Sequence, residues 1–350
     1  MPEYLWRVEE PPLRRLALAP LSAAEALYKS GARIHRWAYD VGLRARARLD
    51  ARVVSIGNLA VGGSAKTPLA AFLARELAAR GRRVALLSRG VGGRRARELT
   101  VVSDGTRVLA SPADVGDEAC LLAAAAPGVP VLAGVRRAAL GLRAIAAFGA
   151  EVLLLDDGFQ HHPLARDVEV VCLDARLGLG NGHVLPRGPL REPVGALARA
   201  DALVFTRARS GDPPPPGAAL LPREPARFRV ALEKLGLRPV AGGERLPLSR
   251  LEGARVGLLA GIARPDRLAA DLVELGADIC ARRVFADHHT YARADLAGLD
   301  PGLLWVTTAK DAVKIPPVWA ERSELVVLEE EVERSAGALE LVEFVAGRLG

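Results

Sequence analysis

Cysteine is scarce in this chain: there are three in 350 residues, at positions 120, 172 and 280. An odd number without paired spacing predicts neither a disulfide framework nor a zinc site. Cys120 and Cys172 lie in apolar runs, which is typical of buried thiols, and a reducing cytoplasm fits this usage.

Long apolar runs are missing as well. The nearest candidate, residues 120–135, is interrupted by Pro127 and Pro130. We therefore expect no membrane-spanning helix, and the first residues lack the charged and apolar regions of a signal peptide.

Aromatic residues make up only 4% of the chain, and no basic–aromatic strand platform is present. This scarcity argues against nucleic-acid binding, which would otherwise fit the net charge of +7. Nucleotides and anionic lipids remain as polyanionic partners. Lysine is also rare: of 48 basic side chains only five are Lys, at positions 29, 66, 234, 310 and 314. In such a chain, a Lys at a strand-to-helix turn suggests a site that needs a compact ammonium group.

Residues 52–68, RVVSIGNLAVGGSAKTP, have the layout of a phosphate-binding P-loop. Apolar residues predict a buried strand, small residues predict a loop, and a helix is predicted from Leu69. Lys66 would add a full positive charge, and the Thr67 hydroxyl could bind Mg²⁺. The backbone N–H groups that would face phosphate oxygens belong to Gly62, Gly63, Ser64 and Ala65.

The strict motif G-x-x-x-x-G-K-[ST] is not met. Ala60 and Ala65 stand at its two glycine positions, and the glycines lie in the middle of the loop. Because a positive φ is costly for a residue with a Cβ, we expect a negative φ at Ala65. The alternative is a glycine-rich turn that binds nothing.

Predicted strands and helices alternate through the rest of the chain. This pattern predicts an α/β fold of the P-loop NTPase type, a mainly parallel sheet with helices on both faces, and a smaller C-terminal α/β domain. We place the P-loop core at 51–209, a Pro-rich linker at 210–224 and the second domain at 225–350. Its closing helix, 336–349, could pack back on the core.

Ligands of a parallel sheet bind beyond the C-terminal ends of its strands. The loops after Ile56, Ser88, Leu155 and Leu173 should therefore share one cleft. A shorter pair of strands, 100–103 and 107–110, is predicted as a hairpin around Asp104-Gly105.

The apolar strand 151–157 ends in Asp156 and Asp157, where a Walker B carboxylate belongs. Mg²⁺ would bridge this carboxylate to Thr67 and the nucleotide phosphates. Two adjacent carboxylates at the edge of a sheet repel each other unless a cation is present, which favours metal binding over a structural role.

Asp117 and Glu118 open a predicted helix, where acidic residues are favourable in any case. Phosphoryl transfer to an alcohol also needs a group that accepts the hydroxyl proton, and Asp117 is a candidate by position. The adjacent pairs 161–162 and 288–289 are histidines whose side chains would point opposite ways, so neither pair should chelate a metal. One of these histidines could instead hold a catalytic Asp.

Residues 1–50 are predicted to form a basic amphipathic helical segment that faces a membrane. Ser22 to Glu25 predicts a capping box. Basic residues flank an apolar stripe at helical spacing, and the stripe consists of Leu27, Ile34, Trp37, Ala38 and Val41. Such a helix can lie on an anionic membrane surface, although an ordinary helix packed on the domain is the alternative.

Taken together, these motifs resemble the tetraacyldisaccharide 4'-kinase (lipid A 4'-kinase) family, whose loop reads G-N-x-x-x-G-G-x-G-K-T-P. The resemblance covers roughly residues 20–345, and its main departure is Ala65 for the usual Gly. The further matching segments, in order, are LSRG at 87–90, GDE at 116–118, DDGFQH at 156–161, GNG at 180–182, LPRGPLREP at 185–193, AGI at 260–262, DHH at 287–289 and TTAKDAVK at 307–314.

The resemblance implies a kinase that uses ATP and Mg²⁺ to phosphorylate the 4'-hydroxyl of a tetraacylated glucosamine disaccharide 1-phosphate, a lipid A precursor. It also implies Asp117 as the catalytic base, coupled to His288, with Lys66 taking part in catalysis. Residues implied in supporting roles are Gln160 near the nucleotide, Glu192 near the metal, and Asn58, Glu118, Arg137 and Arg191 near the acceptor.

The same resemblance implies a peripheral, monomeric protein on the cytoplasmic face of the inner membrane. A soluble small-molecule kinase or ligase on this scaffold, or a GTPase-type metallochaperone, is the alternative. Guanine specificity usually needs an Asn/Thr-Lys-x-Asp segment, and the nearest stretch, 308–311, lacks that spacing.

Overall fold

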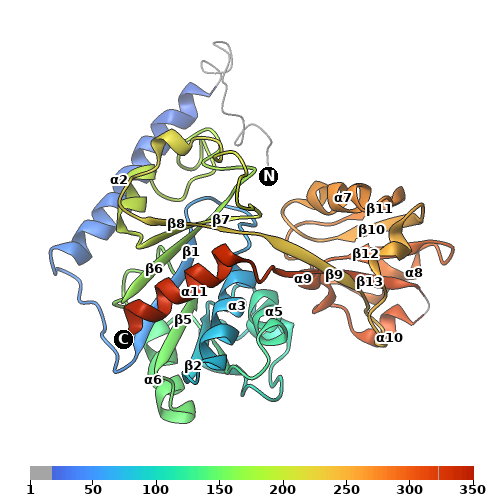
Figure 1. Cartoon of the computed structure of the whole chain (residues 1–350), viewed down its shortest axis with the longest axis horizontal. Helices are drawn as coiled ribbons and strands as arrows, with labels where there is room; N and C mark the ends of the chain where they lie inside the picture. The colour runs from blue at the N-terminus through green and yellow to red at the C-terminus, as the bar shows by residue number, and fades with distance from the viewer. Residues whose placement is uncertain (1–17, 322) are drawn as a thin grey trace.

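The computed structural model describes residues 18–321 and 323–350, which form two β-sheets with their covering helices. The first sheet has eight strands in the order β3-β4-β2-β5-β1-β6-β7-β8, and the second has five in the order β11-β10-β12-β13-β9. The two sheets lie side by side in Figure 1, with the larger one on the left. The predicted fold class, a mainly parallel α/β sheet with a smaller α/β domain, is confirmed.

The larger sheet is parallel except where β3 pairs with β4. Its strands are β1 (Arg52–Asn58), β2 (Val84–Ser88), β3 (Thr100–Ser103), β4 (Val131–Ala133), β5 (Val152–Asp156), β6 (Val168–Asp174), β7 (Ala202–Thr206) and β8 (Ala226–Val230). The smaller sheet contains β9 (Leu232–Pro239), β10 (Arg255–Ala260), β11 (Asp278–Val284), β12 (Leu304–Thr307) and β13 (Leu325–Val332).

Helices cover both faces of the larger sheet. The longer α-helices of the described chain are α2 (Ala19–Asp40), α3 (Lys66–Ala79), α5 (Asp117–Ala125), α6 (Arg137–Phe148), α7 (Pro265–Glu274) and α11 (Ala336–Leu349), with short ones at α4 (Pro112–Val115), α8 (Arg293–Ala297), α9 (Ala309–Ala312) and α10 (Pro317–Ala320). Val54 and Ile56 of β1 point into the core under α3, α5 and α11, whereas Val53 points into the core under α6. This alternation is the expected result of a strand buried on both faces.

Parallel pairing in register brings several strand ends to one edge. Val54 of β1 pairs with Leu154 of β5 and Val168 of β6, and Leu87 of β2 pairs with Leu155. The strand ends predicted to share one cleft therefore do lie together, as parallel strands require.

The change from one sheet to the other falls later than predicted. β8 pairs with β7 in the larger sheet, so residues 210–224 lie between two of its strands and not between the sheets. This Pro-rich segment packs on the core, where Leu179 N–H donates to Pro216 O at 3.2 Å. Because β8 belongs to the larger sheet, the predicted domain border at residue 225 is wrong. Composition alone cannot distinguish a Pro-rich loop that packs on a domain from a linker between two domains.

The closing helix belongs to the first core. Leu341, Val342 and Val345 of α11 are fully buried in the cluster under α3, and Figure 1 shows α11 lying against the larger sheet. Residues 232–332 are thus inserted between β8 and α11, and the antiparallel strands β9 and β13 carry both connections.

One local prediction, the capping box, is wrong, and another, the hairpin, is confirmed only in part. Helix α2 begins at Ala19, so Ser22 lies within the helix and no side chain caps it. Glu25 instead is buried and accepts a 2.8 Å hydrogen bond from the Val184 N–H, a contact that a local pattern cannot predict. The predicted hairpin forms only in part: residues 107–110 return antiparallel to β3, with a bridge from Ser103 to Val108 and a 2.8 Å hydrogen bond from Leu109 N–H to Val102 O, but they form no second strand, and β3 pairs along its length with β4.

The close approach of β1 to the DDGFQ segment generates a stability prediction. A Cβ on Gly57 would lie 2.5 Å from the Phe159 Cβ and 2.6 Å from its N. Gly57→Ala should therefore destabilise the protein by about 1–3 kcal/mol, as overpacking usually does. Gly347→Ala on α11, with open space around its Cβ, is the control and should gain about 0.5–1 kcal/mol. Equal denaturant midpoints for Gly57→Ala and the unmodified protein would contradict this.

Candidate active site

The loop between β1 and α3 is the centre of the site. Helix α3 begins at Lys66, whose side chain is buried, and the loop residues Gly62 to Ala65 precede it. Asn58 is buried below the loop and donates from Nδ2 to Ala60 O at 2.5 Å and to Gly62 O at 3.5 Å. A carbonyl held from below turns the neighbouring N–H groups toward the open side, as anion binding requires.

Ala65 differs from the prediction. Its φ is 53° and its ψ 25°, in the left-handed region, where we expected a negative φ. The turn into α3 thus keeps the conformation that a glycine would adopt, and Ala65 takes the cost of a Cβ there.

Asp156 and Asp157 stand at the end of β5, facing the start of α3. Asp156 accepts a 3.2 Å hydrogen bond from the Thr67 hydroxyl, and its other oxygen, Oδ1, is buried without a hydrogen-bond partner. Burial raises the pKa of Asp156 to about 7, although Lys66 partly offsets the loss of hydration.

Asp157 lies in a more cationic setting. Its carboxylate is 3.5 Å from Lys66 Nζ and accepts hydrogen bonds of 2.9 and 3.0 Å from Arg191 Nη1. Burial acts to raise the pKa of Asp157, but Lys66 and Arg191 outweigh it and hold that pKa below its ordinary value. The two neighbouring carboxylates therefore differ in proton affinity and in partners.

The segments after β5 and β6 together supply a chain of polar side chains next to Asp157. Gln160 Nε2 donates to Asn58 O at 3.1 Å and to Glu192 Oε1 at 3.2 Å. Both oxygens of Glu192 also accept from Arg199, at 2.9 and 3.1 Å. Glu192 thus lies behind Gln160, and its negative charge is paired with Arg199.

Asp117 opens α5, as predicted, and it meets the second domain. Its oxygens both lie 3.1 Å from His288 Nδ1, and Lys314 Nζ is 3.6 Å away. Lys310 Nζ lies 3.4 Å from the other ring nitrogen of His288. The structure therefore brings together the Asp–His pair implied by the sequence, across the two domains.

Glu118 and Arg137 complete the set. Glu118 follows Asp117 and is close enough to Asp156 to contribute to the raised pKa of that carboxyl. Arg137, at the start of α6, is 2% exposed and donates to Gly134 O at 3.0 Å. Burial and the nearby Arg89 lower the pKa of Arg137 to about 10.

Sequence reasoning missed Lys310 and Lys314. Both come from the α9 region of the second domain, and Lys314 also pairs with the buried Asp311 at 3.0 Å. A signal was present: Lys is rare in this chain, and three of its five lysines converge on this site.

The arrangement suits chemistry on a phosphorylated ligand. A loop of N–H groups and Lys66 can hold anionic oxygens, Asp156 and Thr67 can hold a cation, and Asp117 with His288 can accept a proton. A P-loop at the carboxyl edge of a parallel sheet, faced by these carboxylates, defines a nucleotide-dependent phosphotransferase of the P-loop kinase class.

Comparison with known proteins narrows the class. A profile of the family described as Tetraacyldisaccharide-1-P 4'-kinase matches residues 14–347. Relatives named Tetraacyldisaccharide 4'-kinase include one from Anaeromyxobacter sp. (strain Fw109-5), 45% identical over 90% of this chain and 87% of the relative. Another, from Geobacter metallireducens, is 42% identical over 87% of this chain and 91% of the relative.

A solved structure also resembles this one: the "apo" form of LpxK from Aquifex aeolicus in complex with ATP. It is 28% identical, covers 96% of this chain and 99% of its own, and superimposes with a TM-score of 0.76. The chain therefore belongs to the tetraacyldisaccharide-1-P 4'-kinase family.

The conformation of Ala65 generates a prediction. Ala65→Gly should stabilise the protein by about 0.5–1 kcal/mol, because glycine adopts a positive φ without the Cβ penalty. The matched control is Ala146→Gly on the exposed face of α6, which should lose about 0.5–1 kcal/mol. Denaturant midpoints measure both variants, and a lower midpoint for Ala65→Gly would refute the assigned strain.

Proposed function

We propose that this protein transfers the γ-phosphate of ATP to the 4'-hydroxyl of a tetraacylated glucosamine disaccharide 1-phosphate. The observation that carries the proposal is the Asp117–His288 pair beside the P-loop, in a chain of the tetraacyldisaccharide-1-P 4'-kinase family. A kinase that acts on an alcohol needs such a proton acceptor, whereas a nucleotide-dependent switch does not.

In this proposal the P-loop binds the phosphates. The N–H groups of Gly62, Gly63, Ser64 and Ala65 face the phosphate oxygens, and Lys66 neutralises the charge that develops as the γ-phosphate transfers. Asp157, which is itself paired with Arg191, holds the Lys66 ammonium in place. Asn58 supports the loop from below, and Gln160 fixes the Asn58 carbonyl.

Mg²⁺ fits the residues around Asp156. The unpartnered, buried Oδ1 of that carboxylate and the adjacent Thr67 hydroxyl are oxygen donors of the kind that Mg²⁺ prefers. Within residues 18–321 and 323–350, no group of three or more His, Cys, Asp or Glu is placed to chelate a metal. Mg²⁺ bound with a nucleotide usually takes one or two carboxylates, with phosphates and water as the other ligands. Asp156 and Thr67 would hold the ion, with Asp157 and Glu192 nearby. A bound Mg²⁺ would neutralise part of the negative charge of the phosphates.

The proton leaves through Asp117. As the acceptor oxygen forms its bond to the γ-phosphorus and the bond to the β-phosphate oxygen breaks, the hydroxyl proton passes to the Asp117 carboxylate. His288 holds that carboxylate in position and can share the proton, and Lys314 Nζ lies 3.6 Å from the same carboxylate. Glu118, next to Asp117 in the chain, and Arg137, near Asp156 and Asp157, would contact the acceptor.

The acceptor carries acyl chains, and α2 provides the surface that would meet them. Leu27, Ile34 and Trp37 lie along one face of α2 and are 78%, 64% and 54% exposed. No described helix is long and apolar enough to cross a membrane. An exposed apolar face flanked by Lys and Arg fits peripheral binding to anionic lipid on the cytoplasmic side of the inner membrane.

A transfer assay tests the activity. The wild-type protein with labelled ATP, Mg²⁺ and a tetraacylated disaccharide 1-phosphate should give a labelled lipid, and excess GTP should compete poorly. A product that forms only on water-soluble alcohols would favour the soluble-kinase alternative, and efficient competition by GTP would favour the GTPase-type alternative.

The base assignment generates a kinetic prediction. Asp117→Asn should lower kcat by about 10²–10⁴-fold with little change in the KM for ATP, because a catalytic base acts mainly in the transition state. Asp114→Asn is the matched control, since Asp114 is a partly exposed carboxylate in the preceding helix, where it pairs with Arg94. Near-normal turnover by Asp117→Asn would exclude it as the base.

The apolar face of α2 generates a membrane-binding prediction. The triple variant Leu27→Ser, Ile34→Ser, Trp37→Ser should partition onto anionic vesicles at least about 100-fold more weakly, because each large apolar side chain contributes about 1.5–3 kcal/mol when fully buried. The matched control is Leu142→Ser, Val273→Ser, Val318→Ser, whose side chains are equally exposed on other helices. Equal loss of vesicle flotation in both triple variants would argue against α2 as the contact surface, and ATP binding should be unchanged in either.

A further inference from the structure

Four non-glycine residues of the described chain have a positive φ: Ala65 at 53°, Asp157 at 53°, Arg207 at 61° and His288 at 62°. Three of them are residues that the sequence already places in the site. Such a conformation costs about 1–2 kcal/mol for a residue with a Cβ, and it persists where the surrounding structure requires it. The fourth, Arg207, follows β7 and has no role in the account given so far.

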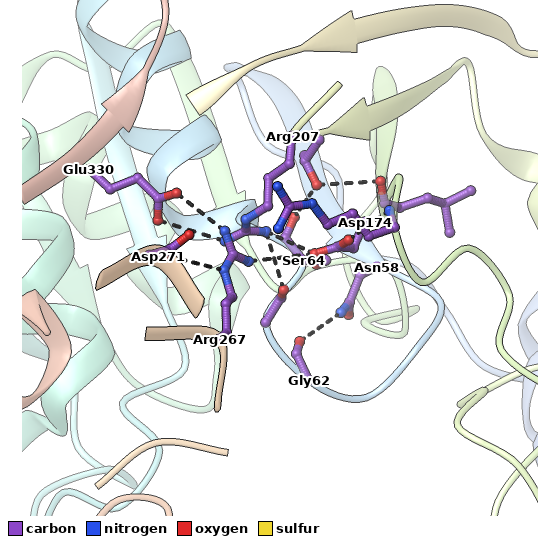
Figure 2. Close-up of polar contacts among 12 residues, drawn as sticks. Asn58, Gly62, Ser64, Asp174, Arg207, Arg267, Asp271 and Glu330 are labelled. Atoms are coloured by element: carbon purple, nitrogen blue, oxygen red, sulfur yellow. Dashed lines mark hydrogen bonds and ion pairs between the residues drawn. The ribbon is translucent and has the colours of Figure 1, made fainter. Parts of the chain in front are cut away.

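Arg207 contacts the outer side of the P-loop. A loop that turns its N–H groups toward phosphate turns its carbonyls away, and these carbonyls then need donors of their own. Asn58 serves Ala60 and Gly62, as described above. Thr206 Oγ1 donates to Ser64 O at 3.1 Å, and Arg207 Nη1 points to Gly63 O at 3.4 Å. Figure 2 shows the Asn58 and Arg207 side chains pointing toward the loop, Asn58 from the end of β1 and Arg207 from the residue after β7.

The Arg207 guanidinium is itself held on two sides. Nη1 donates to Asp174 Oδ2 at 3.1 Å, and Nη2 lies 3.8 Å from Glu330 Oε2, while the side chain is 12% exposed. Asp174 ends β6 in the larger sheet, whereas Glu330 belongs to β13 in the smaller one. Arg207 therefore touches the P-loop, its own sheet and the second domain.

Arg267 closes the same network from the second domain. It lies on α7, and its guanidinium is 3.5 Å from Asp174 Oδ2 and 3.2 Å from Glu330 Oε1. The two arginines thus share two carboxylates that come from different domains (Figure 2). A planar guanidinium with several donors can make such contacts at once, and a Lys ammonium is less suited to this geometry.

We propose that Arg207 is a positioning residue for ATP: it fixes the outer carbonyl of the P-loop and, through Asp174 and Glu330, ties the loop to the domain that carries His288. The proposal rests on ATP as the phosphate donor in the function proposed above. Arg207 would not touch the reacting atoms. Its effect on the ligand would pass through the peptide group of Gly63, whose orientation sets where the neighbouring N–H groups point.

The test compares Arg207→Met with Arg207→Lys. Arg207→Met keeps the stem and loses every donor, so the dissociation constant for ATP without acceptor, and the KM for ATP, should rise about tenfold or more, as with other supporting residues of a binding site. The KM for the lipid acceptor should stay within about twofold. Arg207→Lys should recover part of the loss because it keeps the charge.

The matched control is Arg238→Met, which removes an exposed arginine paired at 2.6 Å with Glu329, the neighbour of Glu330 on β13. It should leave ATP affinity unchanged. A merely structural role for Arg207 would lower the unfolding midpoint and the active fraction while leaving the KM for ATP as it was. Folded Arg207→Met with wild-type ATP affinity would overturn the proposal.

A double-mutant cycle tests the link to the second domain. Arg267→Met alone should weaken ATP binding by several-fold, yet add little to Arg207→Met, because both act through Asp174 and Glu330. Fully additive losses would overturn the link. The wild-type measurement separates this proposal from the function: wild-type protein that fails to bind ATP counts against the proposed function, whereas tight ATP binding that survives both substitutions counts against Arg207 alone.

Discussion

The orientation of the peptide groups in the loop between β1 and α3 is the constraint on which much of the surrounding structure depends. The N–H groups of the loop can face an anion only if its carbonyls find donors on the other side. Asn58 and Thr206 supply two of these donors, and Arg207 supplies a third contact. Since they come from β1 and β7, the order of strands in the sheet becomes a requirement of the loop, and β6 between them provides Asp174.

The second constraint is that the site is shared between the two domains: Asp117 lies on the first, and its partner His288 lies on the second. The contact between Asp117 and His288 depends on the position of the smaller domain, which the connecting strands β9 and β13 set. Charged pairs cross this junction at two places: Lys314 pairs with Asp117 near the reacting centre, and Arg267 pairs with Asp174 near the P-loop. Partly buried pairs of this kind specify geometry more reliably than they add stability.

Much of the fold could be predicted from the pattern of apolar residues, because the strands of a parallel sheet are buried on both faces and so consist of continuous apolar runs. The P-loop and Asp156 were predictable for the same reason: each follows such a run. Other features depend on contacts between distant segments. Arg207 is one arginine among many, and only its neighbours across the sheet and the domain junction distinguish it. The conformation of Ala65 and the role of Glu25 were likewise set by tertiary contacts, so local propensity pointed the other way.

The inserted position of the second domain has a consequence for how the chain is made. Residues 52–230 leave the ribosome with all eight strands of the large sheet, yet α11, which packs on β8, α3 and β6, is translated only after the whole insert. One apolar face of the nascent sheet therefore remains exposed, without α11 packed on it, while about a hundred further residues are synthesised at ~5–20 residues per second. The smaller sheet is fully translated before that face is closed, so the domain that starts first is the one completed last.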